Sequence, residues 1–222
     1  MADMKTLVEQ FKKLDTTSVS DALDRLGITG GLLGIKPVCS GTTFCGQAFT
    51  VRYTPCGAVK GTVGDFLDDV PEGHVVVLDN AGRLNCTVWG DLMTITAQRN
   101  KVAGTVIDGV CRDVPAIRKC GYPIFTRDVF MVTGKDRVYV DGVNIPVAIS
   151  GVQVKPGDIV LADDTGVLVI PQERAADVLQ AAQEIAAKEQ IMEEQLRAGA
   201  TLKQARAAAG YHSLQTRANT GA

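Results

Sequence analysis

The sequence is poor in aromatic side chains and has almost no histidine. Only 5% of its 222 residues are Phe, Trp or Tyr, and the two histidines are His74 and His212. Histidine is the commonest protein ligand of zinc and the usual base of a Ser-His-Asp triad. His74 opens a predicted strand and His212 lies near the C-terminus, so neither kind of site is expected.

The sequence also lacks an excess of charge and a long apolar run. Its 23 basic and 25 acidic residues leave a net charge of −2, which is not the basic footprint of a nucleic-acid-binding protein. No run approaches the roughly 18 apolar residues of a membrane span, and the N-terminus has no signal-peptide pattern. The six cysteines show no CxxC pair, which is typical of reduced thiols. We expect a cytoplasmic protein that binds neither nucleic acid nor membrane.

The remaining composition is that of a folded globular protein, with 45% hydrophobic and 22% charged residues. The length and the absence of a long linker predict one domain over residues 1–222. Helices are expected in an N-terminal segment, 1–27, and in a long C-terminal helix, 173–199, followed by a polar tail, 210–222. Thr16 or Thr17 is the expected N-cap of the second helix, and Gly27 its stop.

Between these helical segments the hydrophobic pattern alternates between strand and helix. Residues 47–54 alternate as a half-buried strand does, and 74–80 form the continuous apolar run of a buried strand. A helix from about 89, a strand from about 102 and a short helix from about 112 follow. The stretches YPIFT, FMVTG, RVYV, PVAISGVQV and DIVLADDTGVLVIP then predict consecutive strands. The pattern indicates an α/β fold.

Charged residues occur where two of these helices begin. Asp91 starts one helix, and Arg112 and Asp113 start the next. Twenty residues separate Asp91 from Arg112. Successive right-handed βαβ units would bring both helix starts to the carboxyl ends of the strands, where open α/β sheets bind ligands. Two carboxylates without His or Cys suit Mg²⁺ or Mn²⁺.

Arg112 and the helix start add groups that bind anions. The guanidinium offers a planar fork for a carboxylate or an enolate, and the Leu92 and Met93 amides would point at an anion. Together with a metal, these groups describe a site for a 2-oxo acid. The alternative is purely structural, because Asp is a common helix cap and an Arg–Asp pair is commonly a surface salt bridge.

The segment GDLMTITAQRNKVAGTVIDGVCRD resembles the class II pyruvate aldolases that cleave 4-hydroxy-4-methyl-2-oxoglutarate and 4-carboxy-4-hydroxy-2-oxoadipate. The shared signature is Asp, twenty residues, then Arg-Asp. TTSVSDALDRLG and VKPGDIVLADDTGVLVIP extend the resemblance over most of the chain. It implies a layered ββα swivelling-type domain that assembles as a homotrimer or homohexamer, with oxaloacetate decarboxylation as a side activity.

The resemblance also implies roles. Asp113 would hold the divalent metal, and Asp91 would orient or deprotonate a metal-bound water. Arg112 would bind the pyruvyl oxygen and stabilise the enolate, while Gly90, Leu92 and Met93 would frame the carboxylate of the 2-oxo diacid substrate. A neighbouring subunit's C-terminal helix would contribute a catalytic Glu, for which Glu189 is the candidate and Glu184 and Glu193 are alternatives.

The same superfamily contains regulators of ribonuclease activity that bind protein and do no aldolase chemistry. Those regulators characteristically carry Gly at the position of Asp91, which favours the aldolase branch here. Other potentially reactive residues receive structural interpretations: Cys111 as a packed thiol and Asp163–Asp164 as part of a turn. Lys60 and Lys101 lie outside the expected crevice, which argues against a Schiff-base mechanism.

Overall fold

The computed structural model describes residues 3–58 and 60–210, and the expected tail beyond Gly210 lies outside them. Its core is an eight-stranded sheet with the order β1-β5-β4-β3-β2-β9-β10, in which β6 also pairs with β2. The strands are β1 Lys36–Pro37, β2 Phe44–Pro55, β3 Val75–Asp79, β4 Gly104–Cys111, β5 Ile124–Val129, β6 Val138–Val143, β9 Ile159–Asp163 and β10 Gly166–Ile170. A separate hairpin pairs β7 Val147–Ile149 with β8 Val152–Val154.

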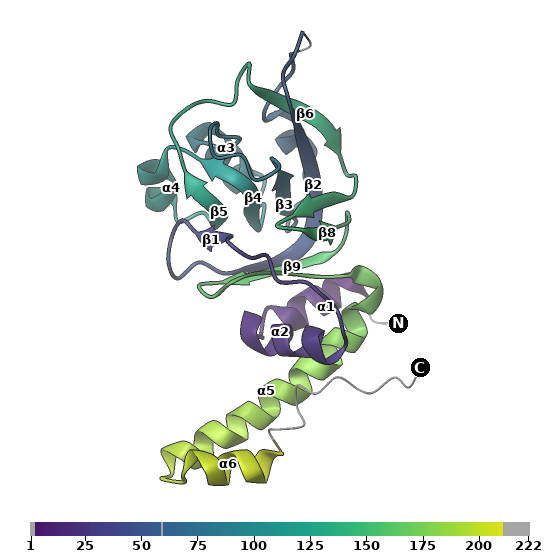
Figure 1. Cartoon of the computed structure of the whole chain (residues 1–222), viewed down its shortest axis with the longest axis vertical. Helices are drawn as coiled ribbons and strands as arrows, with labels where there is room; N and C mark the ends of the chain where they lie inside the picture. The colour runs from purple at the N-terminus through teal and green to yellow at the C-terminus, as the bar shows by residue number, and fades with distance from the viewer. Residues whose placement is uncertain (1–2, 59, 211–222) are drawn as a thin grey trace.

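Four neighbouring strands, β2, β3, β4 and β5, run parallel, and all other pairings are antiparallel. Helix α3, Asp91–Arg99, connects β3 to β4, and α4, Val114–Cys120, connects β4 to β5. The sheet curls toward a barrel with α3 and α4 outside it (Figure 1). The mixed α/β class and the layered arrangement expected from the sequence are confirmed.

Residues 75–78 of β3 are all apolar because successive side chains point alternately into two apolar layers, one on each face of the sheet. Val75 and Val77 face the inside of the curled sheet, whereas Val76 and Leu78 face α3 and α4. The strand is therefore buried on both faces, as parallel strands covered by helices are. Each such aliphatic side chain contributes about 1.5–3 kcal/mol on full burial.

A third layer covers the other outer face of the sheet. It consists of α1 Met4–Phe11, α2 Thr16–Arg25 and α5 Ala175–Arg197, which pack on β9 and β10 through a separate apolar cluster. The long α5 extends well beyond the sheet, and the short α6, Leu202–Ala209, folds back along it (Figure 1).

Several local details differ from the sequence expectations. Asp15, not Thr16 or Thr17, caps α2, because its carboxylate accepts the Ser18 amide at 2.6 Å. The expected strand in FMVTG is reduced to one bridge at Thr133, beyond which the Gly134 carbonyl accepts the Arg137 and Val138 amides in a turn. Helix α6 was not expected and begins with a capping box at Thr201. Gly27 follows the end of α2 with a φ of +68°, as expected of a stop.

Candidate active site

The sequence-predicted trio of Asp91, Arg112 and Asp113 meets where α3 and α4 begin. Asp91 is the first residue of α3, and Asp113 is the N-cap of α4. The Asp113 Oδ2 atom accepts the backbone N–H of Asp91 at 3.2 Å and lies 3.3 Å from the Arg112 Nε atom. One carboxylate oxygen therefore joins the two helix starts.

The contacts of Asp113 differ from those of an ordinary helix cap. A capping Asp accepts an amide two or three residues into its own helix, but the Asp113 side chain makes no such bond. It turns instead to the neighbouring helix. Its backbone φ is +59°, a left-handed conformation that costs free energy in a non-glycine residue and that clusters at functional sites.

The absence of a side chain at Gly90 leaves space for the Asp113 carboxylate in this position. A Cβ at residue 90 would lie 2.6 Å from Asp113 Oδ2 and 3.4 Å from Arg112 Nε. The φ of Gly90 is −152°, so the need for glycine is one of space and not of backbone conformation. The Trp89 side chain beside it is buried and donates from Nε1 to the Thr94 hydroxyl at 2.9 Å, and that hydroxyl donates to the Gly90 carbonyl. These bonds hold the start of α3 in place.

The amides at the start of α3 are only partly open to a ligand. The Leu92 N–H donates to the Asp91 Oδ1 atom at 2.7 Å, and the Thr94 N–H donates to the Gly90 carbonyl. Within the described residues, the Met93 amide has no acceptor. A substrate carboxylate would bind there directly and reach the Leu92 amide only by displacing Asp91.

The residues in this region can accommodate a divalent cation. Asp113 Oδ2 is engaged, but within the described residues Asp113 Oδ1 and Asp91 Oδ2 have no hydrogen-bond partner. No group of three or more His, Cys, Asp or Glu side chains suited to a metal occurs in the described part of the chain. Mg²⁺ is often held by one or two carboxylates with water and substrate completing its shell, so this donor set fits it.

A cavity of about 420 Å³ opens over this site. Its floor includes Gly90, Asp91, Leu92, Met93 and Arg112, and a loop over 61–65 and a turn over 133–135 complete its walls. Asp113 is not among the residues that line it. Asp65 and Lys135 are ionisable lining residues that sequence reasoning did not identify, because neither belongs to a recognisable motif.

The candidate glutamate lies elsewhere in the chain. The Glu189 carboxylate, on α5, is 3.3 Å from the Ser18 hydroxyl of α2 and does not line the cavity. Burial raises the pKa of Glu189, and the nearby Asp21 raises it further. Glu184 pairs with Arg25, and Glu193 with Arg197. A role for Glu189 from a neighbouring subunit stays a prediction.

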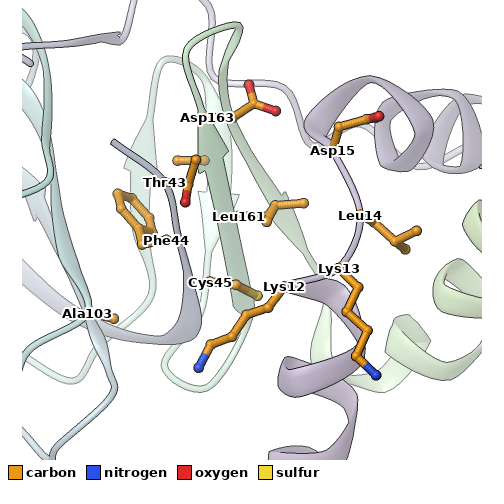
Figure 2. Close-up of a pocket in the computed structure, with 11 residues that line it drawn as sticks. Lys12, Lys13, Leu14, Asp15, Thr43, Phe44, Cys45, Ala103, Leu161 and Asp163 are labelled. Carbon is orange, nitrogen blue, oxygen red and sulfur yellow. The ribbon is translucent and has the colours of Figure 1, made fainter. Parts of the chain in front are cut away.

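A larger cavity of about 530 Å³ lies between the α1–α2 connection and strands β2 and β9 (Figure 2). Its carboxylates are used structurally. Asp163 accepts from the Thr16 amide and hydroxyl and from the Thr165 amide, and Asp15 caps α2. Burial raises the pKa of the Cys45 thiol to about 12, so this thiol is unreactive. The turn interpretation of Asp163 agrees with these contacts.

The other reactive side chains considered from the sequence also find structural explanations. Cys111 is fully buried among apolar side chains, and burial raises its pKa to about 12. Lys60 pairs with Asp136, and Lys101 pairs with Glu72; neither lysine lines the 420 Å³ cavity.

In the described residues, no helix has the length and apolar character needed to cross a membrane.

Comparison with known proteins relates this site to a family. A family model described as "RraA-like: Aldolase/RraA" matches residues 16–169. Protein DlpA of Legionella pneumophila is 44% identical over 91% of this chain, and the match covers only 34% of the length of DlpA. A protein of Halalkalibacterium halodurans named "Putative 4-hydroxy-4-methyl-2-oxoglutarate aldolase" is 32% identical over 84% of this chain and 86% of its own.

A solved structure from Streptomyces coelicolor shares the fold with a TM-score of 0.76. It is RraAS2, described as an unusual member of the RNase ES inhibitor RraA protein family. The two chains are 26% identical, and the match covers 88% of this chain and 96% of the other. The relatives therefore include proteins named for aldolase activity and proteins named for ribonuclease inhibition.

Proposed function

The chain belongs to the Aldolase/RraA family, and from that premise we propose that it is a divalent-metal-dependent aldolase. The substrate would be a 2-oxo diacid with a tertiary alcohol, such as 4-hydroxy-4-methyl-2-oxoglutarate or 4-carboxy-4-hydroxy-2-oxoadipate. Cleavage would release pyruvate and a second oxo acid. The observation that carries the proposal is the convergence of the Arg112 guanidinium and the first amide of α3 on one carboxylate oxygen of Asp113.

This convergence favours chemistry over a structural cap or a surface ion pair. A cap would be satisfied within α4, and a surface pair would not require a glycine at residue 90. Here Asp113 reaches across to α3, Gly90 leaves no room for a Cβ, and a cavity lies above. The Asp113 Oδ1 and Asp91 Oδ2 atoms would hold Mg²⁺ or Mn²⁺, which when bound would polarise the 2-oxo group of the substrate.

Arg112 is suited to bind the developing enolate. Its Nε atom is engaged with Asp113, which orients the guanidinium plane, and within the described residues its two terminal nitrogens have no acceptor. These nitrogens would donate to the 2-oxo oxygen and stabilise the negative charge that forms there as the C3–C4 bond breaks. The Met93 amide would bind the adjacent substrate carboxylate.

Asp91 is the candidate for proton transfer. The proton of the C4 hydroxyl would pass to a water that the Asp91 carboxylate orients, so that the C4 carbonyl forms as the C3–C4 bond breaks. The electron pair of that bond remains on the pyruvate fragment as its enolate, and a proton returned at C3 completes pyruvate. Oxaloacetate would lose CO₂ through the same enolate. Glu189 of the partner subunit would assist if the chain assembles as a trimer or hexamer.

The experiment is pyruvate release from 4-hydroxy-4-methyl-2-oxoglutarate and from oxaloacetate, coupled to lactate dehydrogenase. We expect release with Mg²⁺, loss of release with EDTA after removal of the chelated metal, and recovery when Mg²⁺ is added back. The coupling enzyme is assayed alone under each condition with added pyruvate. A folded, metal-loaded protein that releases pyruvate from neither compound would overturn the proposal.

The likeness to RraAS2 supports a second candidate, a protein-binding regulator of ribonuclease activity. The two candidates differ at Asp91. An Asp91→Gly variant should lose pyruvate release if the chain is an aldolase, with an unchanged thermal unfolding midpoint as evidence of folding. If wild type and variant are equally inactive on these substrates, and both inhibit a ribonuclease, the regulator is the better description.

A further inference from the structure

The cavity over the candidate site holds a second cation, Lys135, with no assigned role. Besides Arg112, it is the only Lys or Arg among the lining residues found in the described part of the chain. Within residues 3–58 and 60–210 its side chain has no ion-pair or hydrogen-bond partner. The neighbouring Asp136 is paired with Lys60.

The backbone holds Lys135 on a defined turn. Its amide donates to the Thr133 hydroxyl at 3.2 Å, and the Gly134 carbonyl accepts the Arg137 and Val138 amides. A Cβ on Gly134 would lie 2.3 Å from the Thr87 carbonyl oxygen, so the turn lies close against the segment that leads to α3. The same turn is therefore packed against the floor of the cavity.

The strand register relates Lys135 to Arg112. Thr87 forms parallel bridges to Val110 on one side and to Thr133 on the other. The backbones of Val110 and Thr133 are thus two strand spacings apart, about 9–10 Å. Arg112 follows Val110 by two residues, and Lys135 lies on the turn that begins after Thr133. The two cations therefore belong to segments on opposite sides of the one that leads to α3, and both line the same cavity.

We propose that Lys135 is the specificity-determining residue that binds the distal carboxylate of the substrate, while Arg112 and the start of α3 bind the pyruvyl end. This assignment rests on the proposed function and deepens it. A 2-oxo monoacid leaves Lys135 without a partner, whereas a 2-oxo diacid satisfies both cations. The chain would therefore select diacids because each carboxylate meets its own cation in the cavity.

The test compares two substrates that share the pyruvyl end. 4-Hydroxy-4-methyl-2-oxoglutarate has a distal carboxylate, and 4-hydroxy-4-methyl-2-oxopentanoate has a methyl group in its place. For Lys135→Met, loss of a charged hydrogen bond should raise KM for the diacid by about 10- to 150-fold. The kcat for the diacid and the KM for the monoacid should stay within about threefold of wild type, and Lys135→Arg should recover most of the lost affinity.

Lys60→Met is the matched control, because it removes a cation that contacts the same turn but does not line the cavity. It should leave both KM values unchanged. Equal effects of Lys135→Met on the two substrates, or no effect on the diacid, would overturn the assignment. An effect of Lys60→Met as large as that of Lys135→Met would also overturn it, because the cause would then be the general positive potential.

Binding separates failure of this assignment from failure of the aldolase proposal. If the wild type cleaves neither substrate, the aldolase proposal fails, and calorimetric titration with 2-oxoglutarate and with 2-oxobutyrate decides the role of Lys135. Weaker binding of 2-oxoglutarate alone by Lys135→Met supports the distal carboxylate site. Equal binding of 2-oxoglutarate by wild type and variant, or no binding of it by the wild type, overturns that site.

Discussion

A single methyl group at residue 90 offers a stringent test of the site geometry. In a Gly90→Ala variant, the new Cβ would lie 2.6 Å from Asp113 Oδ2, about 0.8 Å short of ordinary van der Waals contact. The φ and ψ of Gly90 are −152° and −164°, which alanine adopts without strain. The perturbation therefore acts on the Asp113 carboxylate and hardly on the backbone.

The expected consequence is loss of activity with modest loss of stability. The Asp113 carboxylate must retreat, which would weaken its bonds to the Asp91 amide and Arg112 together. A displacement near 1 Å in a catalytic group can cost about 100-fold in rate, so kcat/KM for pyruvate release should fall by about that factor. Overpacking against one half-exposed side chain should cost about 1 kcal/mol, or roughly 2–4 °C in the unfolding midpoint.

The assay is pyruvate release at saturating Mg²⁺, measured with thermal unfolding of the same preparations. Gly31→Ala is the matched control, because a Cβ at Gly31 meets nothing within 4 Å and its φ is not in the left-handed region. A Gly90→Ala variant that keeps more than a third of the wild-type kcat/KM would refute the reasoning. So would an equal loss of activity in the Gly31→Ala control.

Three further predictions concern single side chains. Arg112→Ala should lower kcat by about 10²–10³-fold, the usual cost of removing one donor to a developing oxyanion, and a fall of less than tenfold in steady-state assays contradicts its role. Burial raises the pKa of Glu189 above its ordinary 4.5, so the folded state binds the proton more tightly than the unfolded state. Its contribution is therefore most favourable at pH 4 and is lost as the pH rises through the folded pKa. Glu189→Gln should then unfold at higher urea than wild type at pH 7 but not at pH 4, and the same shift at both pH values contradicts this. Burial raises the pKa of the Cys45 and Cys111 thiols to about 12, so both should react with a disulfide reagent at pH 8 only after unfolding. The exposed Cys120 should react in the native state. Native-state labelling of Cys111 would overturn its interpretation as a packed thiol.

Sequence reasoning located the helix starts of the site because the signals are local. The apolar run of β3 and the N-terminus of α3 at Asp91 follow from hydrophobic period and helix-start chemistry. Local reasoning was less accurate where two residues compete for one role. Asp15 precedes Thr16 and offers a carboxylate, which accepts the Ser18 amide, so the cap lies earlier than the expected Thr16 or Thr17.

The residues that form the walls of the cavity could not be predicted from local sequence patterns. Lys135 reaches the site only because Thr133 pairs with Thr87, 46 residues earlier, and no local pattern specifies that pairing. The loop over 61–65 is held by the Thr62 carbonyl, which accepts the Val140 amide of β6. The position of this loop therefore depends on β6, which pairs with β2 in a register that shifts between Arg52 and Tyr53.

The sequence by itself determined the α/β class, the two-sided burial of the parallel strands and the placement of Asp91, Arg112 and Asp113 at helix starts. These properties depend on side-chain period and spacing along one chain segment. Only the tertiary structure decided that the Asp113 carboxylate crosses to the Asp91 amide, that Gly90 has no room for a methyl group and that Lys135 lines the cavity. Such contacts depend on strand register and close packing, which bring together residues whose separation in sequence carries no periodic signal.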